Sequence, residues 1–163
     1  MAVSVEELYG NLWRTPQIGF EQQLSRSLAP RGSGLLKEMF RDTGVNANQT
    51  VLDIGCRDAT HAISLAQTFG CRVIGIDPIA GHIDDAARNI AEAGLGECVT
   101  VKQGAVEALP LAEATIDRIW CRDVLNHVDL PVALAECRRV LRLGGQLVVF
   151  QTLATDLLEP QEA

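Results

Sequence analysis

The stretch VLDIGCRDAT, Val51–Thr60, decides how this chain folds. It opens with a short apolar run that ends at Gly55, which is the pattern of a strand buried inside a sheet. Apolar residues then recur at helical spacing and stop before Gly70: Ala62, Ile63, Leu65, Ala66 and Phe69. A buried strand that leads directly into a helix predicts the first half of a βαβ unit.

The alternation of strands and helices continues to residue 151. Further strands are expected at Cys71–Ile76, Cys98–Gln103, Thr115–Cys121 and Gln146–Gln151, with a helix over residues 79–93. Asp129 is a plausible N-cap for another helix, with Pro131 in its first turn, and this helix is expected to run through Leu141 to Gly144 and Gly145. Alternation of this kind predicts an α/β fold with a doubly wound parallel sheet covered on both faces.

Residues 1–49 differ in character and look like one or two helices. Apolar residues mark a first helix around Tyr9, Leu12 and Trp13, and a second through Leu35, Leu36, Met39 and Phe40. Two interpretations stay open, a simple cover for the sheet and a lid over a ligand. The expected organisation is therefore a helical cover or lid at 1–49, a ligand-binding domain at 50–151 and a short tail at 152–163.

The composition of the chain argues against several classes of function. The chain has 163 residues, 47% apolar and 21% charged, which suits one globular domain. Its net charge of −7, without a concentrated basic face, argues against nucleic-acid binding. Five cysteines without C-x-x-C spacing predict neither a metal site nor a disulfide framework. The absence of a signal-like start and of a membrane-length apolar run leads us to expect a cytoplasmic protein without membrane contact.

Two strand ends point to a ligand site. In an open α/β sheet, ligands bind beyond the carboxyl ends of the strands. The first strand ends near Asp53 and Gly55, where a glycine lets the chain turn sharply and a helix begins. The second ends at Asp77, whose carboxylate could accept hydrogen bonds from the two hydroxyls of a ribose. Together these features describe a nucleoside site.

At this point the sequence resembles a known family, the class I S-adenosylmethionine (SAM) dependent methyltransferases of the small-molecule branch, such as quinone C-methyltransferases. The resemblance covers roughly residues 48–151 and rests on VLDIGCRDAT, VIGID, GAVEALPL, IDRIWCRDVLNHV and LAECRRVLRLGGQLVV, in the family's order and spacing. It implies a Rossmann-like fold with strand order 3-2-1-4-5, of which the C-terminal strands 6 and 7 are expected to be missing here. It also implies SAM as cofactor and methyl transfer to a small acceptor.

The resemblance also assigns roles to residues. Asp53 and Gly55 would approach the methionine part of SAM, Asp77 would hold the ribose, and Ala105 and Val106 would border the adenine. The other positions it places at the cofactor are Cys56, Arg57, Pro78, Cys121 and Arg122.

Three residues depart from the family pattern. Arg57 and Ala59 stand where the family has its second and third glycines, and Ala105 stands where an acidic residue is common. Arg57 could pair with the cofactor's carboxylate, swing into solvent or obstruct the site. Loss of the acid at position 105 removes one hydrogen bond, worth about 0.5–1.5 kcal/mol.

His127 is the catalytic candidate, because it is the only histidine expected near the crevice and could act as general base. A capping or packing role is the preferred alternative. His61 is expected to touch only solvent or cofactor and His82 to lie on the surface, while Asp123 is interpreted as a structural acceptor.

Two further functions stay open. The departures above also fit a non-catalytic or truncated SAM-binding domain. An NAD-type oxidoreductase would need G-x-G-x-x-G, of which only Gly55 is present, since Arg57 and Thr60 stand at the other places.

The end of the sequence raises a separate expectation. QLVVFQT should form an apolar edge strand, which proteins rarely leave bare. Self-association through that edge, completion by another chain, and truncation of a longer protein are the three explanations, with truncation preferred.

Overall fold

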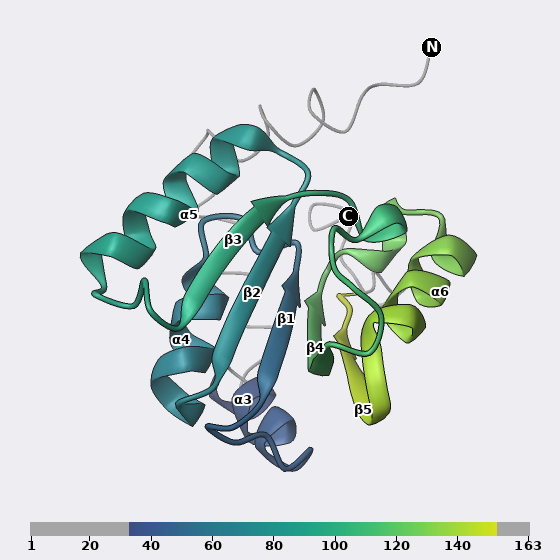
Figure 1. Ribbon diagram of the computed structural model, residues 1–163, viewed down its shortest axis with the longest axis horizontal. Helices are drawn as coiled ribbons and strands as arrows, with labels where there is room; N and C mark the ends of the chain where they lie inside the picture. Colours follow the sequence, from purple (N-terminus) through teal and green to yellow (C-terminus); the bar gives the residue numbers. More distant parts are fainter. Residues whose placement is uncertain (1–32, 153–163) are drawn as a thin grey trace, which may run out of the picture.

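A computed structural model describes residues 33–152, and its centre is a sheet of five parallel strands (Figure 1). The strands follow the order β3-β2-β1-β4-β5, which confirms the predicted topology. Their bounds are Thr50–Ile54 for β1, Arg72–Asp77 for β2, Val99–Gln103 for β3, Ile116–Arg122 for β4 and Leu141–Phe150 for β5. The central strand β1 pairs with β2 on one side and with β4 on the other, so the carboxyl ends of these three strands lie together.

Helices cover both faces of the sheet (Figure 1). On one face lie α3 (Ser33–Arg41), α4 (Thr60–Phe69) and α5 (Ala80–Glu92). On the other lie α6 (Leu130–Val140) and the 3-10 turn η1 (Val106–Ala108), while a second such turn, η2 (Leu125–His127), precedes α6.

An aromatic cluster anchors α3 to the sheet. Phe40 is fully buried, and its ring centroid lies 5.2 Å from that of Trp120 on β4 and 5.9 Å from that of Phe69 on α4. Phe150 of β5 lies against the other side of Trp120, at 4.6 Å. The predicted helix around Leu35 to Phe40 is therefore present and covers the sheet. The helix expected around Tyr9 and Trp13 lies outside the described residues.

The helix after β4 begins as predicted and ends earlier. The Asp129 side chain accepts a hydrogen bond from the backbone N–H of Val132 at 3.3 Å, and proline stands in the first turn. However, α6 ends at Val140, so the expected continuation through Leu141 to the glycines is wrong. The segment before β4 takes up the last carbonyls of α6, because the N–H groups of Ala114 and Thr115 donate to residues 139 and 140.

Leu141 instead starts β5, opposite Ile116. The pairing then jumps to Arg118 with Gln146, so residues 142–145 form an irregular excursion. The Arg142 guanidinium holds it by donating to the Asp117 carboxylate at 2.9 Å. Within the described sheet β5 is an edge strand, and Val149 on it is 41% exposed.

The cysteines behave as small apolar residues. Within residues 33–152 the five thiols are free, and four of them are buried. This part of the chain has no group of three histidine, cysteine or acidic side chains that could hold a metal ion. None of its helices has the length and apolar character needed to cross a membrane.

Candidate functional site

The loop after β1 lies in close contact with the loop after β4. Gly55 adopts a left-handed backbone with φ of 72°, and a Cβ added there would lie 2.5 Å from Cγ2 of Val124. Only glycine fits this close approach. The loop lies where the winding of the sheet reverses between β1 and β4, which is the usual ligand position in such folds.

The same loop has left-handed backbone at two residues that are not glycine. Arg57 has φ of 46° and Ala59 has φ of 63°. These are the two positions where the resembled family has glycine. The chain therefore keeps the backbone course of a glycine-rich loop, although left-handed backbone costs an L-residue about 1–2 kcal/mol.

The carboxylate of Asp77, at the end of β2, fixes this loop. Its Oδ2 accepts from the Arg57 N–H at 3.0 Å, and its Oδ1 accepts from the Ile79 N–H at 3.0 Å. Nδ1 of His82 lies 3.0 Å from the same Oδ1. His82 was expected on the surface, and this is a correction, because its side chain is only 17% exposed and turns back toward β2. A carboxylate has about four acceptor directions, so the protein leaves about one for a ligand.

Asp53 supplies a second buried carboxylate, on β1. Only 2% of the residue is exposed, and within residues 33–152 its Oδ2 has no hydrogen-bond partner. Burial, with the neighbouring charge of Asp77, raises the pKa of Asp53 to about 8. A buried acceptor without a partner is costly. The site is therefore suited to a ligand that brings a positive charge or a strong donor.

A third wall comes from the segment after β3. The N–H of Gly104 donates to the carbonyl of Asp77 at 3.0 Å, and the Gln103 amide donates to the carbonyl of Pro78 at 3.0 Å. These bonds place Ala105, which is exposed, and Val106, which is buried, beside the end of β2. The structure thus brings several predicted site residues together at the carboxyl ends of β1 and β2: Gly55, Arg57, Asp77, Pro78, Ala105 and Val106. Asp53 and Cys56 are buried beneath them.

The end of β4 differs from expectation. Cys121 is fully buried in the core under α6, and burial raises the pKa of its thiol to about 12, so its side chain does not line the site. Arg122 is held by protein partners, with Nη1 3.0 Å from Nε2 of His61 and Nε 3.4 Å from the Asp123 carboxylate. Asp123 accepts from the Thr152 N–H at 2.6 Å, in agreement with a structural role.

The histidines occupy different environments. His127 lies in η2 with an exposed side chain. His61 is largely buried, and burial together with the charge of Arg122 lowers its pKa to about 4. It was expected to meet only solvent or cofactor, and its contact with Arg122 corrects that expectation. No local pattern indicates this contact, since 61 residues separate the two in sequence.

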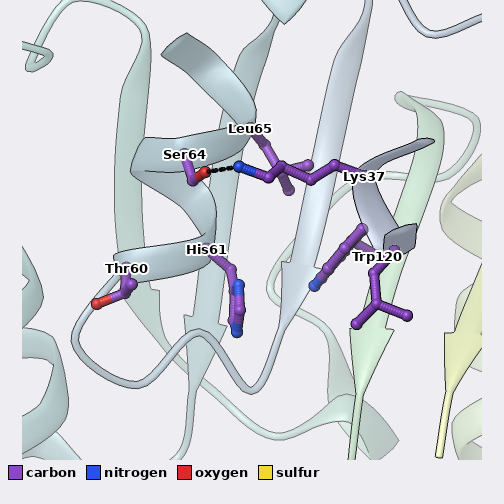
Figure 2. Close-up of a pocket in the computed structure, with 7 residues that line it drawn as sticks. Lys37, Thr60, His61, Ser64, Leu65 and Trp120 are labelled. Carbon is purple, nitrogen blue, oxygen red and sulfur yellow. Dashed lines mark hydrogen bonds between the residues drawn. The ribbon is translucent and has the colours of Figure 1, made fainter. Parts of the chain in front are cut away.

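Figure 2 shows His61 and Trp120 facing each other across a small pocket between α3, α4 and β4. Its volume is about 120 Å³, and Lys37 closes one side by donating to the Ser64 hydroxyl at 3.0 Å. The remaining lining residues are Leu36, Thr60 and Leu65. This pocket was not predicted from the sequence.

Comparison with known proteins finds a family match over the same part of the chain. The sequence model of the family described as "Methyltransferase domain" matches residues 52–149, which span β1 to β5. The methyltransferase GfsG of Streptomyces halstedii is 29% identical over 81% of this chain and 48% of its own length.

Two solved structures extend the comparison. A geranyl diphosphate methyltransferase in complex with SAM has a TM-score of 0.69 and 26% identity, over 83% of this chain and 55% of that one. The [4+2]-cyclase SpnF has a TM-score of 0.66 and 27% identity, over 71% of this chain and 43% of that one. The chain spans about half the length of the relatives it matches.

Replacing Arg57 with glycine should stabilise the fold. Relief of the left-handed strain gives about 1–2 kcal/mol, and the greater freedom of glycine in the unfolded chain offsets about 0.4–1 kcal/mol of it. We expect Arg57→Gly to raise the free energy of unfolding by about 0.5–1 kcal/mol in urea titrations. Arg88→Gly, in the exposed body of α5, is the control and should lose about 1 kcal/mol. Equal losses in both variants would contradict the strain assignment.

Asp53 should make stability depend on pH. Its folded pKa of about 8 exceeds the ordinary value of 3.8, so the stability that its protonated form contributes is lost as pH rises from about 4 to 8. The melting temperature of Asp53→Asn relative to wild type should therefore increase between pH 5 and pH 8. Asp85→Asn controls for loss of an exposed carboxylate. A pH-independent difference for Asp53→Asn would show that Asp53 is already ionised at pH 5.

Proposed function

This chain belongs to the methyltransferase domain family, and from that premise we propose that it binds SAM and transfers its methyl group to a small-molecule acceptor. The observation that supports this most strongly is the buried Oδ2 of Asp53 beneath the Gly55 loop, which has no hydrogen-bond partner among residues 33–152. Burial keeps this carboxyl group mostly protonated at neutral pH, and the ammonium and sulfonium groups of SAM would lower its pKa and pair with the ionised form. An NAD site would need the glycines of G-x-G-x-x-G, and Arg57 and Thr60 stand at two of these positions.

Each part of the cofactor has a suitable group in the chain. Asp53 and Gly55 would hold the methionine end, and the free acceptor direction of Asp77 would take one ribose hydroxyl. Because three protein groups already bind this carboxylate, one such bond fits better than two. The backbone of Ala105 and Val106 would border the adenine, beside Pro78.

Arg57 is a candidate partner for the cofactor's own carboxylate. Its guanidinium is 42% exposed and lies 3.9 Å from the Asp58 carboxylate, so the pairing with Asp58 is weak enough to yield to a ligand.

Methyl transfer from SAM requires little acid–base catalysis by the protein. Bound SAM supplies a methyl carbon already activated by its sulfonium, so the chain has to orient donor and acceptor and exclude water. His127 remains the candidate base, because it lies in the loop after β4 and is accessible. A quinone-type carbon acceptor is a narrower proposal that rests on the resemblance of residues 116–149 to that branch.

A second candidate function is a SAM-binding domain without methyl transfer. The alanine at position 105 and the arginine at 57 favour it, and one structural relative of similar closeness is described as a cyclase. SAM binding without turnover on a panel of quinone, phenol and amine acceptors would select this candidate.

Calorimetry with SAM, S-adenosylhomocysteine and NAD side by side tests the cofactor. We expect binding of the first two and none of NAD. Asp77→Asn keeps the shape of the side chain and should weaken SAM binding by about 1.5–3 kcal/mol, as for loss of a hydrogen bond to a charged group. Asp117→Asn, at the amino end of β4 and away from the carboxyl ends of the strands, is the control. Unchanged SAM affinity in folded Asp77→Asn would refute its assigned role.

We also propose that a further strand pairs with the edge of β5, either from another segment of polypeptide or from a second copy of the chain. Leu130 and Leu134 on α6, with Val149 on β5, are 41–43% exposed near that edge. Exposed apolar edges favour pairing, and a lysine on the edge strand opposes it. Light scattering should show a dimer that Val149→Lys dissociates if a second copy pairs there. A wild-type monomer would rule out the second copy.

A further inference from the structure

We propose that Glu136 and Arg139 of α6 are positioning residues that hold the segment after β3 in place to receive the adenine of the cofactor. This inference rests on the proposed function, because it concerns how one part of the SAM site is kept in shape. The segment concerned is Gly104–Leu111, called the adenine segment below.

The adenine segment is not part of the sheet and takes its position from bonds to β2 and to α6. At one end, Gly104 donates to the Asp77 carbonyl at the end of β2. At the other, the segment is bonded to α6, which approaches from the opposite face of the sheet from α4 and α5. Ala105 and Val106 lie between these two attachments.

The attachment to α6 consists of an ion pair with the backbone groups around it and of a weaker bond at the start of the helix, where Oε1 of Glu107 accepts from the Asp129 N–H at 3.3 Å. Arg139 donates from Nε to Oε1 of Glu136 at 2.6 Å and from Nη2 to Oε2 at 2.7 Å, which is a bidentate pair. The same guanidinium donates to the carbonyl of Leu111 at 2.8 Å and to that of Leu109 at 3.1 Å. Oε2 of Glu136 accepts from the Leu109 N–H at 2.9 Å. Two side chains thus satisfy three backbone groups of the adenine segment.

Side-chain packing also restrains the residues that would border the adenine. Val106 and Leu109 are each 5% exposed and pack in the core against Ala133 and Cys137 of α6. Because Leu109 is fixed both through its backbone and through its side chain, the turn that contains Val106 has little freedom to move. The hydrogen bond from Arg139 also lowers the pKa of Glu136, so the pair stays charged at neutral pH.

The neighbouring Arg138 provides a matched control for Arg139. It occupies the adjacent position in α6 and has the same charge, and its side chain is exposed in the structure. The two arginines therefore separate a positional effect from a general effect of removing positive charge from α6.

The test is binding of two ligands to Arg139→Met and to the control Arg138→Met. The first ligand is S-adenosylhomocysteine, and the second is S-inosylhomocysteine, in which an oxygen replaces the 6-amino group of adenine. Calorimetry on the wild-type chain should show preference for the adenine ligand, since backbone donors and acceptors held in fixed directions discriminate between the two bases. Arg139→Met should weaken S-adenosylhomocysteine at least about 10-fold, the scale of one hydrogen bond to a charged group. It should also reduce the preference, whereas Arg138→Met should change neither.

A merely structural role for the ion pair would lower the melting temperature and leave the preference between the two ligands at the wild-type ratio, and that result would overturn the proposal. A wild-type chain that binds both ligands equally would also overturn it. If Arg139→Met does not fold, Glu136→Gln carries the test, because it keeps the side-chain shape while weakening the pair with Arg139. Failure of the wild-type chain to bind either ligand would instead refute the proposed function.

Discussion

The structure of the site depends on the hydrogen bonds between the Asp77 carboxylate and the backbone around it. This one side chain joins the end of β2 to the loop after β1, through the Arg57 N–H, and to the start of α5, through the Ile79 N–H. The loop needs such support because two of its residues hold left-handed backbone without being glycine. The bonds to Asp77 offset that strain, and they also set the position from which the loop faces a ligand.

The same arrangement concentrates negative charge under the loop. Asp53 is buried on β1, and the charge of Asp77 is one of the causes that raise its pKa. A cationic ligand would offset the cost of ionising Asp53, so the burial that weakens the folded chain at neutral pH also favours SAM. Such a balance between stability and function is common where binding sites store unfavourable interactions.

Much of the fold could be predicted because the strands are continuous apolar runs that end in glycine or aspartate, and because glycine and Asp129 mark helix boundaries. The end of α6 could not, since Leu141 continues the helical spacing of apolar residues. What ends the helix is the distant pair Ala114 and Thr115, whose N–H groups bind its last carbonyls. A local pattern carries no sign of such a contact.

Part of the candidate site could likewise be predicted from the sequence and part could not. The positions at the strand ends, Gly55 and Asp77, could be predicted because a parallel sheet brings the carboxyl ends of its strands together. The partners of these residues depend on how side chains return across the fold, as His82 does to Asp77 and His61 to Arg122. Burial of Cys121 also escaped prediction, because alternation along β4 alone does not say which face α6 covers.

Similarity in fold does not by itself decide the chemistry, since a methyltransferase and a cyclase match this chain about equally well. More specifically, we propose that the carboxyl ends of β1 and β2 and the segment after β3 form a SAM site. The crystal structure of the chain with S-adenosylhomocysteine tests it most directly. We expect the amino-acid end of the ligand over Asp53 and Gly55, a ribose hydroxyl on Asp77 and the adenine beside Ala105 and Val106. A ligand bound elsewhere, or an unchanged site at saturating ligand, would contradict it.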